Sequence, residues 1–117
     1  MIVHIMKKAT WEKRKDLDFW GEENLEMDGF IHCCTIPYLW RVAHTFQDIS
    51  EKLVIVCIDE KRLQAEVRYD EDHRSGRRYP HIYGLVNREA VVSVLPYLRD
   101  ENGHYQKNDA FMATEDE

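Results

Sequence analysis

The chain has 117 residues, of which 44% are apolar and 11% aromatic, so it can bury one core and is not a disordered chain. Its net charge of -6 argues against binding to duplex nucleic acid, which needs a basic face, but leaves room for a small anionic ligand in a locally basic pocket. No apolar run approaches the roughly 20 residues of a membrane span, so no membrane association is expected.

The cysteines and the first residues indicate the compartment. The 3 cysteines lack a metal-binding spacing, which favours reduced thiols in a cytoplasmic protein. The chain begins with a strand-like run instead of the basic and apolar regions of a signal peptide, so none is expected.

The first half of the chain predicts two strands, each followed by a helix. In order, these are a strand over 1–6, a helix from Trp11 to about Leu17 capped by Thr10, an irregular connection over 18–29, a strand over 30–34 and a helix from about Pro37 to Gln47. Alternation in the second strand predicts that Phe30, His32 and Cys34 share one face.

The second half predicts mainly strands. In order, these are a buried strand over 53–58, a helical turn over 59–63, a strand over 65–69, a charged loop over 70–79, an extended segment around His81, a helical start at 87–90 and a strand over 91–98. Asn102-Gly103 predicts a turn that folds residues 103–107 back as a hairpin.

This order of elements favours the α+β class, because strands and helices do not alternate strictly. We predict a single domain over 1–107 with a small split or mixed sheet and two or three short helices. Residues 108–117 are predicted to be an acidic, flexible tail.

Three histidines in apolar or aromatic frames are the main functional signal. They are His4 in Ile2-Val3-His4-Ile5, His32 in Gly29-Phe30-Ile31-His32-Cys33, and His81 in Tyr79-Pro80-His81-Ile82-Tyr83. A buried imidazole needs partners for its ring nitrogens, supplied by protein or by ligand. Singly, each histidine is explained by internal hydrogen bonds, but together they raise the hypothesis of one shared cleft.

The surroundings of these histidines suggest ligand contacts. Thr35 is predicted to cap a helix just after His32, and a helix N-terminus offers free N–H groups to an anion. Tyr83 lies two residues after His81 on an extended segment, so both face one side and can contact one ligand.

Further hypotheses concern the arginines, the cysteines and a metal site. Arg77 and its neighbours Arg74 and Arg78 form either a solvated charged loop or a phosphate clamp. Cys34 could pair with His32 as a nucleophile, although residues two apart on a strand are too distant for a routine hydrogen bond. No short ligand spacing supports a zinc site at the histidines, so no metal is predicted.

The motifs Gly29-Phe30-Ile31-His32-Cys33 and Pro80-His81-Ile82-Tyr83-Gly84 carry a family resemblance, together with the opening strand and Ala9-Thr10-Trp11. The chain resembles the bacterial family called domain of unknown function 952, over nearly its whole length to about residue 107. It departs from that family in having Cys34 where serine is usual and Tyr79 where phenylalanine is usual.

The resemblance implies a fold similar to the ADP-ribosyltransferase group, which includes the RNA 2'-phosphotransferases. NAD or ADP-ribose is then the expected ligand. His4 would meet the ribose, His32 would be a second polar contact, and His81 and Tyr83 would line the far wall. If the usual serine hydroxyl contacts the ligand, Cys34 is a weaker donor at the same position.

Transfer chemistry would need a carboxylate near the ribosyl centre, for which Glu71 or Asp70 is the candidate. His32, His4 and Glu71 are therefore the candidate catalytic residues, and the candidate ligand-binding residues are His81, Tyr83, Cys34, Thr35 and Arg77. The alternatives are a nucleotide-binding module without catalysis and a structural protein without a small-molecule site.

Overall fold

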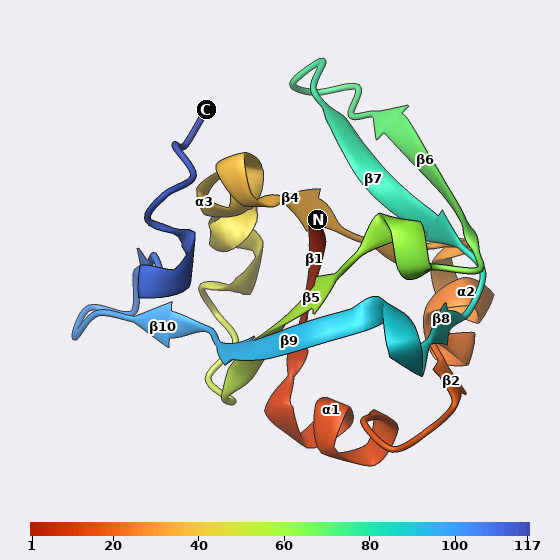
Figure 1. Cartoon of the computed structure of the whole chain (residues 1–117). Helices are drawn as coiled ribbons and strands as arrows, with labels where there is room; N and C mark the ends of the chain where they lie inside the picture. Colours follow the sequence, from red (N-terminus) through yellow and green to blue (C-terminus); the bar gives the residue numbers. More distant parts are fainter.

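The longest apolar strands form an antiparallel sheet at the centre of the molecule (Figure 1). The computed structural model describes all 117 residues. Strands β1 (Ile2–Lys7) and β5 (Leu53–Ile58) lie side by side, with β4 (Cys34–Thr35) beside β1 and β9 (Val91–Pro96) beside β5. All residues of β5 are buried, as its uninterrupted apolar run predicts.

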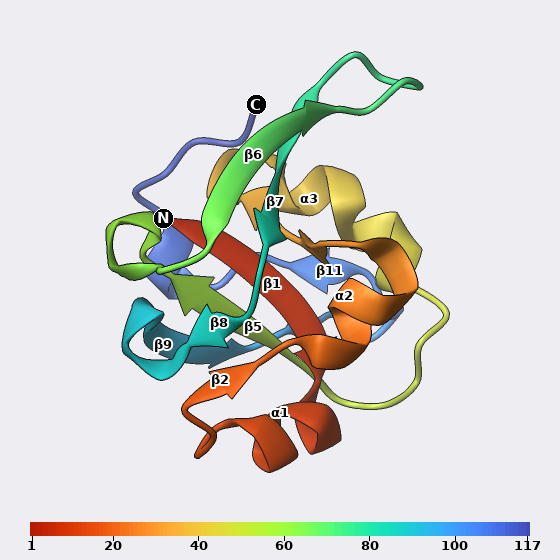
Figure 2. The same cartoon turned by 90° about the vertical axis from the view of Figure 1, so that its right-hand side faces the viewer.

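A second sheet contains β3 (Ile31–His32), β7 (Arg78–Tyr83) and β6 (Glu66–Glu71), in the order β3-β7-β6. Strands β6 and β7 form a hairpin whose tip extends beyond the rest of the molecule (Figure 2). The predicted charged loop over 70–79 is therefore shorter, because β6 continues to Glu71 and β7 already begins at Arg78.

Two small strand pairs complete the sheets. Strand β2 (Phe19–Trp20) pairs with β8 (Val86–Asn87), and β10 (Leu98–Arg99) pairs with β11 (Tyr105–Gln106). The second pair confirms the hairpin predicted from Asn102-Gly103. The predicted strand over 91–98 is interrupted at Tyr97, between β9 and β10.

The helices are short. The α-helices are α1 (Lys8–Arg14), α2 (Glu22–Asp28) and α3 (Leu39–Val42). The 3-10 helices are Ile36–Tyr38, Ala43–Phe46, Glu60–Arg62, Arg88–Ala90 and Asp109–Phe111. No helix has the length and apolar character needed to cross a membrane.

Three predictions for the first half of the chain need correction. Helix α1 begins at Lys8 after Lys7, so Thr10 lies inside it and caps nothing. The predicted irregular connection over 18–29 contains β2 and α2 instead. The predicted helix over 37–47 is one α-helical turn between two 3-10 turns. The propensity of this segment favours helix, but tertiary packing determines its regularity.

The predicted strand over 30–34 is wrong as a single element, because it divides between two sheets. Strand β3 pairs with β7, whereas β4 pairs with β1. Cys33 lies between them, and its N–H donates a hydrogen bond of 3.1 Å to the carbonyl oxygen of Pro80. His32 and Cys34 therefore belong to different sheets and do not share one strand face.

The two faces of the central sheet bury separate apolar clusters. One includes Ile2 and Val56, and the other includes Val3 and Ile55, as the alternation of side chains requires. Phe111 is 2% exposed and belongs to the second cluster, so the packed part of the chain includes residues beyond 107.

The α+β class is confirmed, with several small sheets and three α-helices. All strand pairings are antiparallel, so the sheets are split but not mixed. The central sheet and the β3-β7-β6 sheet meet at the β3–Cys33–β4 segment, where the predicted histidine cleft lies.

Candidate functional site

The three histidines singled out from the sequence line one cleft with a volume of about 1210 Å³. Its walls come from β1, from residues 32–34, from the helical segment over 40–46 and from the β6–β7 hairpin. Figure 1 shows α3 on one side of β4 and the hairpin on the other. The predicted convergence of His4, His32 and His81 is thus present in the structure.

His4 lies at the inner wall of the cleft and is only 7% exposed. Its Nδ1–H donates to the carbonyl oxygen of His32 at 2.5 Å, which leaves Nε2 as an acceptor. Burial lowers the pKa of His4 to about 4; the hydrogen bond to His32 opposes this shift, and the charges of Arg14 and His32 add to it. His4 is therefore a neutral imidazole at pH 7.

His32 and His81 are opposite one another on paired strands β3 and β7. Their ring centroids are 5.3 Å apart, and Phe30 stacks on His81 with centroids 4.0 Å apart and an interplanar angle of 15°. The His32 side chain is 61% exposed, and its Nε2 lies 3.4 Å from Oδ2 of Asp28. The two rings form an aromatic wall with Phe30, with the more exposed ring of His32 available to a ligand.

Asp70 holds His81 in place. The Nδ1–H of His81 donates to Oδ2 of Asp70 at 2.7 Å, and the hydroxyl of Tyr83 donates to the same oxygen. The bonds from Tyr83 and then His81 lower the pKa of Asp70, so it remains a carboxylate, and the bond to Asp70 raises the pKa of Tyr83. Because Nδ1 carries the proton, Nε2 of a neutral His81 is the free acceptor.

Asp70 accepts hydrogen bonds from His81 and Tyr83, and Glu71 has no such partners. Both carboxylates line the cleft, but Asp70 is opposite Tyr79 on the hairpin and shares the face of His81, whereas Glu71 is opposite Arg78. Sequence alternation identifies this face once β6 is extended through residue 71. Because the predicted strand ended at residue 69, the sequence did not reveal that Asp70 shares the face of His81.

Two predicted ligand residues do not line the cleft. The hydroxyl of Tyr83 is bonded to Asp70, and the ring lies under the guanidinium of Arg68 at 4.5 Å. Thr35 is opposite Ile2 in the central sheet and makes no side-chain cap hydrogen bond to the following 3-10 helix. Thr35 occupies the N-cap position of that helix, as predicted, but its side chain does not bond the free N–H groups.

Cys34 lines the cleft but is 4% exposed. Burial raises the pKa of Cys34 to about 12, and burial raises the pKa of Cys33 well above its usual value. The reactive form of cysteine is the thiolate, so these protonated thiols do not match the nucleophile considered from the sequence.

Arginines supply positive charge at the mouth of the cleft. Arg74 and Arg77 line it, and neither forms a salt bridge. Arg41 also lines it, with Nε donating to the carbonyl oxygen of Glu117 at 2.6 Å and its guanidinium 4.4 Å from the ring centroid of Trp40. Arg77 was predicted from the sequence as a ligand residue, whereas Arg41, which lies on a separate helical segment, was not.

At the hairpin tip, the carboxylate of Asp72 accepts a hydrogen bond from within the loop. The hydroxyl of Ser75 donates to Oδ2 of Asp72 at 2.8 Å, and the N–H of Arg77 donates to the hydroxyl of Ser75 at 3.2 Å. The bond from Ser75 lowers the pKa of Asp72. No group of three or more His, Cys, Asp or Glu side chains is arranged to hold a metal ion.

Comparison with solved structures shows the fold. The crystal structure of protein CC0527 from Caulobacter crescentus is 24% identical, with a TM-score of 0.76, over 90% of this chain and 92% of that chain. The solution NMR structure of CC0527 is 24% identical, with a TM-score of 0.75, over 96% of this chain and 97% of that chain. At this identity the likeness concerns the fold alone.

Comparison with family models shows the family. The matching model is described as a protein of unknown function, DUF952, and it covers residues 5–94, which include His32 and His81 but begin just after His4. No curated protein matches the chain. Because the model spans most of the sequence, the chain belongs to the DUF952 family.

Proposed function

We propose that the histidine cleft binds the ADP-ribose part of NAD, or a related phosphorylated ligand. The observation that supports this most directly is the gathering of His4, His32 and His81 in one cleft with Arg74 and Arg77. Its volume of about 1210 Å³ is ample for a nucleotide, since small-molecule pockets commonly measure about 300–1,000 Å³.

The chemistry of the lining matches the parts of such a ligand. Guanidinium groups bind phosphate through two parallel hydrogen bonds, so Arg74 and Arg77 are the proposed diphosphate contacts. The exposed ring of His32 and the free Nε2 of His81 are suited to ribose hydroxyls. Tyr79 lines the same cleft and offers an aromatic surface to a base.

The finer proposal is that the fold is of the ADP-ribosyltransferase type and that the bound ligand undergoes ribosyl or 2'-phosphate transfer. His32, His4 and Glu71 remain the proposed catalytic residues. A carboxylate near the ribosyl carbon would stabilise positive charge in the transition state. Glu71 is the free carboxylate for this role, because Asp70 already accepts two hydrogen bonds.

A binding module without catalysis is the second candidate. Glu71 is exposed on the hairpin, and its side chain makes no hydrogen bond that would fix it against the histidines. This weaker placement of the carboxylate favours binding over transfer. Both candidates share the same first test, which is binding itself.

Calorimetric titration with NAD, ADP-ribose and an RNA carrying a 2'-phosphate tests the proposal. We expect at least one of them to bind and Arg77→Gln to weaken that binding by about tenfold to a hundredfold, because a charge-assisted hydrogen bond contributes roughly 1.5–3 kcal/mol. Arg78→Gln is the matched control, because Arg78 is the next residue but does not line the cleft.

Two results would contradict the proposal. One is the absence of binding by all three compounds at saturating concentrations. The other is equal affinity of Arg77→Gln and Arg78→Gln for the compound that binds. Conversion of a bound compound, lost in Glu71→Gln, would separate the enzyme from the binding module.

A further inference from the structure

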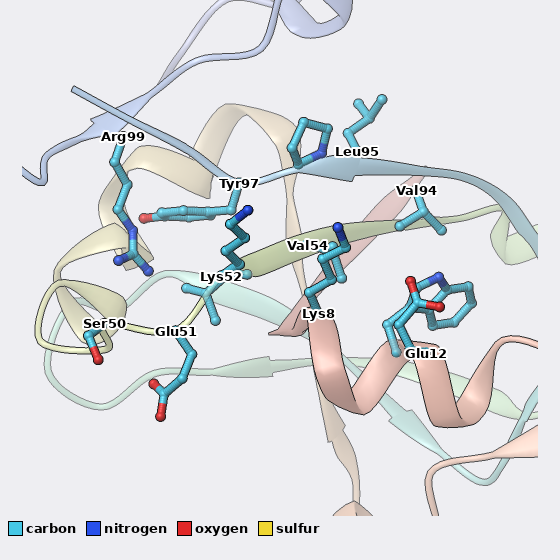
Figure 3. A pocket seen from close by; sticks show the side chains of 13 residues that line it. Lys8, Glu12, Ser50, Glu51, Lys52, Val54, Val94, Leu95, Tyr97 and Arg99 are labelled. Carbon is cyan, nitrogen blue, oxygen red and sulfur yellow. The ribbon is translucent and has the colours of Figure 1, made fainter. Parts of the chain in front are cut away.

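A second groove lies apart from the histidines, where α1 approaches the ends of β5 and β9 (Figure 3). Its volume is about 580 Å³, which is within the usual range for small-molecule sites. It shares no lining residue with the histidine cleft. A ligand bound here would therefore be independent of the proposed nucleotide site.

One part of the groove surface is apolar. It includes Val54, Val94, Pro96 and Tyr97, with Trp11 from α1. Val54 belongs to the first core cluster, and Trp11 and Val94 pack against that cluster. The groove thus gives a ligand access to the edge of the core, where an apolar group gains free energy by leaving water.

Three cations line the same groove without carboxylate partners. Lys8, Lys52 and Arg99 form no salt bridge. Figure 3 shows the side chains of Lys8 and Lys52 beneath β9, with Arg99 beside Tyr97 at one end. This gathering of positive charge occurs on a chain whose net charge is -6.

The two carboxylates of the groove are paired with other lysines. Glu12 lies 2.8 Å from Nζ of Lys15, and Glu51 lies 3.5 Å from Nζ of Lys7. Figure 3 shows the Glu51 carboxylate pointing away from the lysines that line the groove. The two carboxylates therefore form no direct ion pair with the three lining cations, which outnumber them in the groove.

The guanidinium of Arg99 is fixed in position. Its Nη1 donates to the carbonyl oxygen of Ile49 at 2.5 Å, and its centre lies 5.4 Å from the ring centroid of Tyr97. Its Nη2 is buried and has no hydrogen-bond partner in the protein. Arg99 thus places a permanent charge at the Tyr97 end of the groove.

We propose that this groove binds a small organic oxyanion, a carboxylate or phosphate carried on an apolar body. The oxyanion lies among Lys8, Lys52 and Arg99, and the apolar body lies against Val94 and Tyr97. Neither feature suffices alone, because exposed ion pairs are weak and the apolar surface is limited. Their combination selects an amphiphilic anion over a bare anion or a neutral apolar compound.

An NMR titration of the isotopically labelled full chain with phenyl phosphate tests this inference, with benzyl alcohol and inorganic phosphate in parallel. We expect phenyl phosphate to shift the amide signals of Lys52, Val94 and Tyr97, at lower concentration than either comparison compound. The inference is overturned if phenyl phosphate up to about 10 mM shifts nothing, or shifts only signals near His32 and His81.

Charge-matched variants locate the anion. We expect the double variant Lys8→Gln/Lys52→Gln to weaken phenyl phosphate binding by about fivefold to tenfold, from the loss of two exposed ionic contacts. Lys13→Gln/Lys61→Gln removes the same charge from lysines outside the groove and should leave binding unchanged. Equal affinities of the two double variants would refute the site.

Discussion

His4 connects the buried core with the cleft. It lies on β1 of the central sheet, and its Nδ1–H bonds the carbonyl oxygen of His32 on β3. Its ring also lies 5.8 Å from that of Trp20, measured between centroids. The neutral form of this imidazole is therefore part of the packing between two sheets as well as part of the cleft wall.

Folding should depend on pH through His4. Its pKa is about 4 in the folded chain, against 6.5 for an unperturbed histidine. Between these values the unfolded chain binds one more proton, so the free energy of unfolding falls as the pH is lowered through this window. We expect the loss to be about 2.5 kcal/mol, measured by urea unfolding at pH 7.5 and pH 4.5.

The variant His4→Asn isolates this contribution, because its amide can still donate to His32 but does not titrate. Its stability should change less between the two pH values than that of the native chain, while carboxylates contribute equally to both. An identical pH dependence in the two proteins would show that His4 is not the titrating group.

At the residue scale, the sequence predicted the positions of the histidines but not their partners. Apolar frames around His4, His32 and His81 are local patterns, and they raised the hypothesis of one shared cleft, which all three histidines line in the structure. The bond between His81 and Asp70 depends on the register of β6 against β7. Register is set by pairing across the hairpin, so the local pattern did not reveal it.

At the scale of elements, α2 depends on glycines at both ends. Gly21 and Gly29 have φ values of 112° and 81°, in the left-handed region that favours glycine. A Cβ at Gly21 would lie 2.5 Å from Cδ1 of Ile31, whereas a Cβ at Gly29 would contact nothing within 4 Å. Gly21 thus allows close packing of α2 against the β3 strand.

Gly21→Ala should therefore destabilise the chain by about 2–4 kcal/mol, from backbone strain plus the displacement of Ile31. Gly29→Ala introduces only backbone strain and should lower the free energy of unfolding by about 1–2 kcal/mol. Thermal or urea unfolding of both variants measures the difference. Equal costs would mean that the contact with Ile31 relaxes freely.

The predictability of an element followed the length of its apolar run. Strands β1 and β5 were predicted to within one residue at each end, because continuous burial leaves a strong pattern. Helix α2 was missed because its seven residues include only Leu25 and Met27 as apolar positions. The division at Cys33 was missed because partner strands distant in sequence determine it.

For the molecule as a whole, the residues after 107 contribute to the core. Phe111 is 2% exposed in the second apolar cluster, and the N–H of Glu117 donates to the carbonyl oxygen of Pro37 at 3.1 Å. The sequence predicted a flexible acidic tail here because its charges dominate the composition. A single buried aromatic residue carries too little pattern to indicate packing.

Phe111→Ala should cost about 3–5 kcal/mol of folding free energy, the usual range for removing a buried phenylalanine side chain. The adjacent Met112→Ala is the control, because Met112 is 61% exposed and its loss should change stability by less than about 0.5 kcal/mol. Chemical unfolding of the two variants compares them. Equal small effects would instead support a tail detached from the core.

The β3–Cys33–β4 segment has a mechanical consequence. Only Cys33 separates a strand paired with β7 from a strand paired with β1. A rotation of one sheet against the other would therefore bend the chain at this residue, next to the backbone of His32. The same residue lines the cleft between the two walls, so we expect a ligand that contacts both walls to restrain this junction.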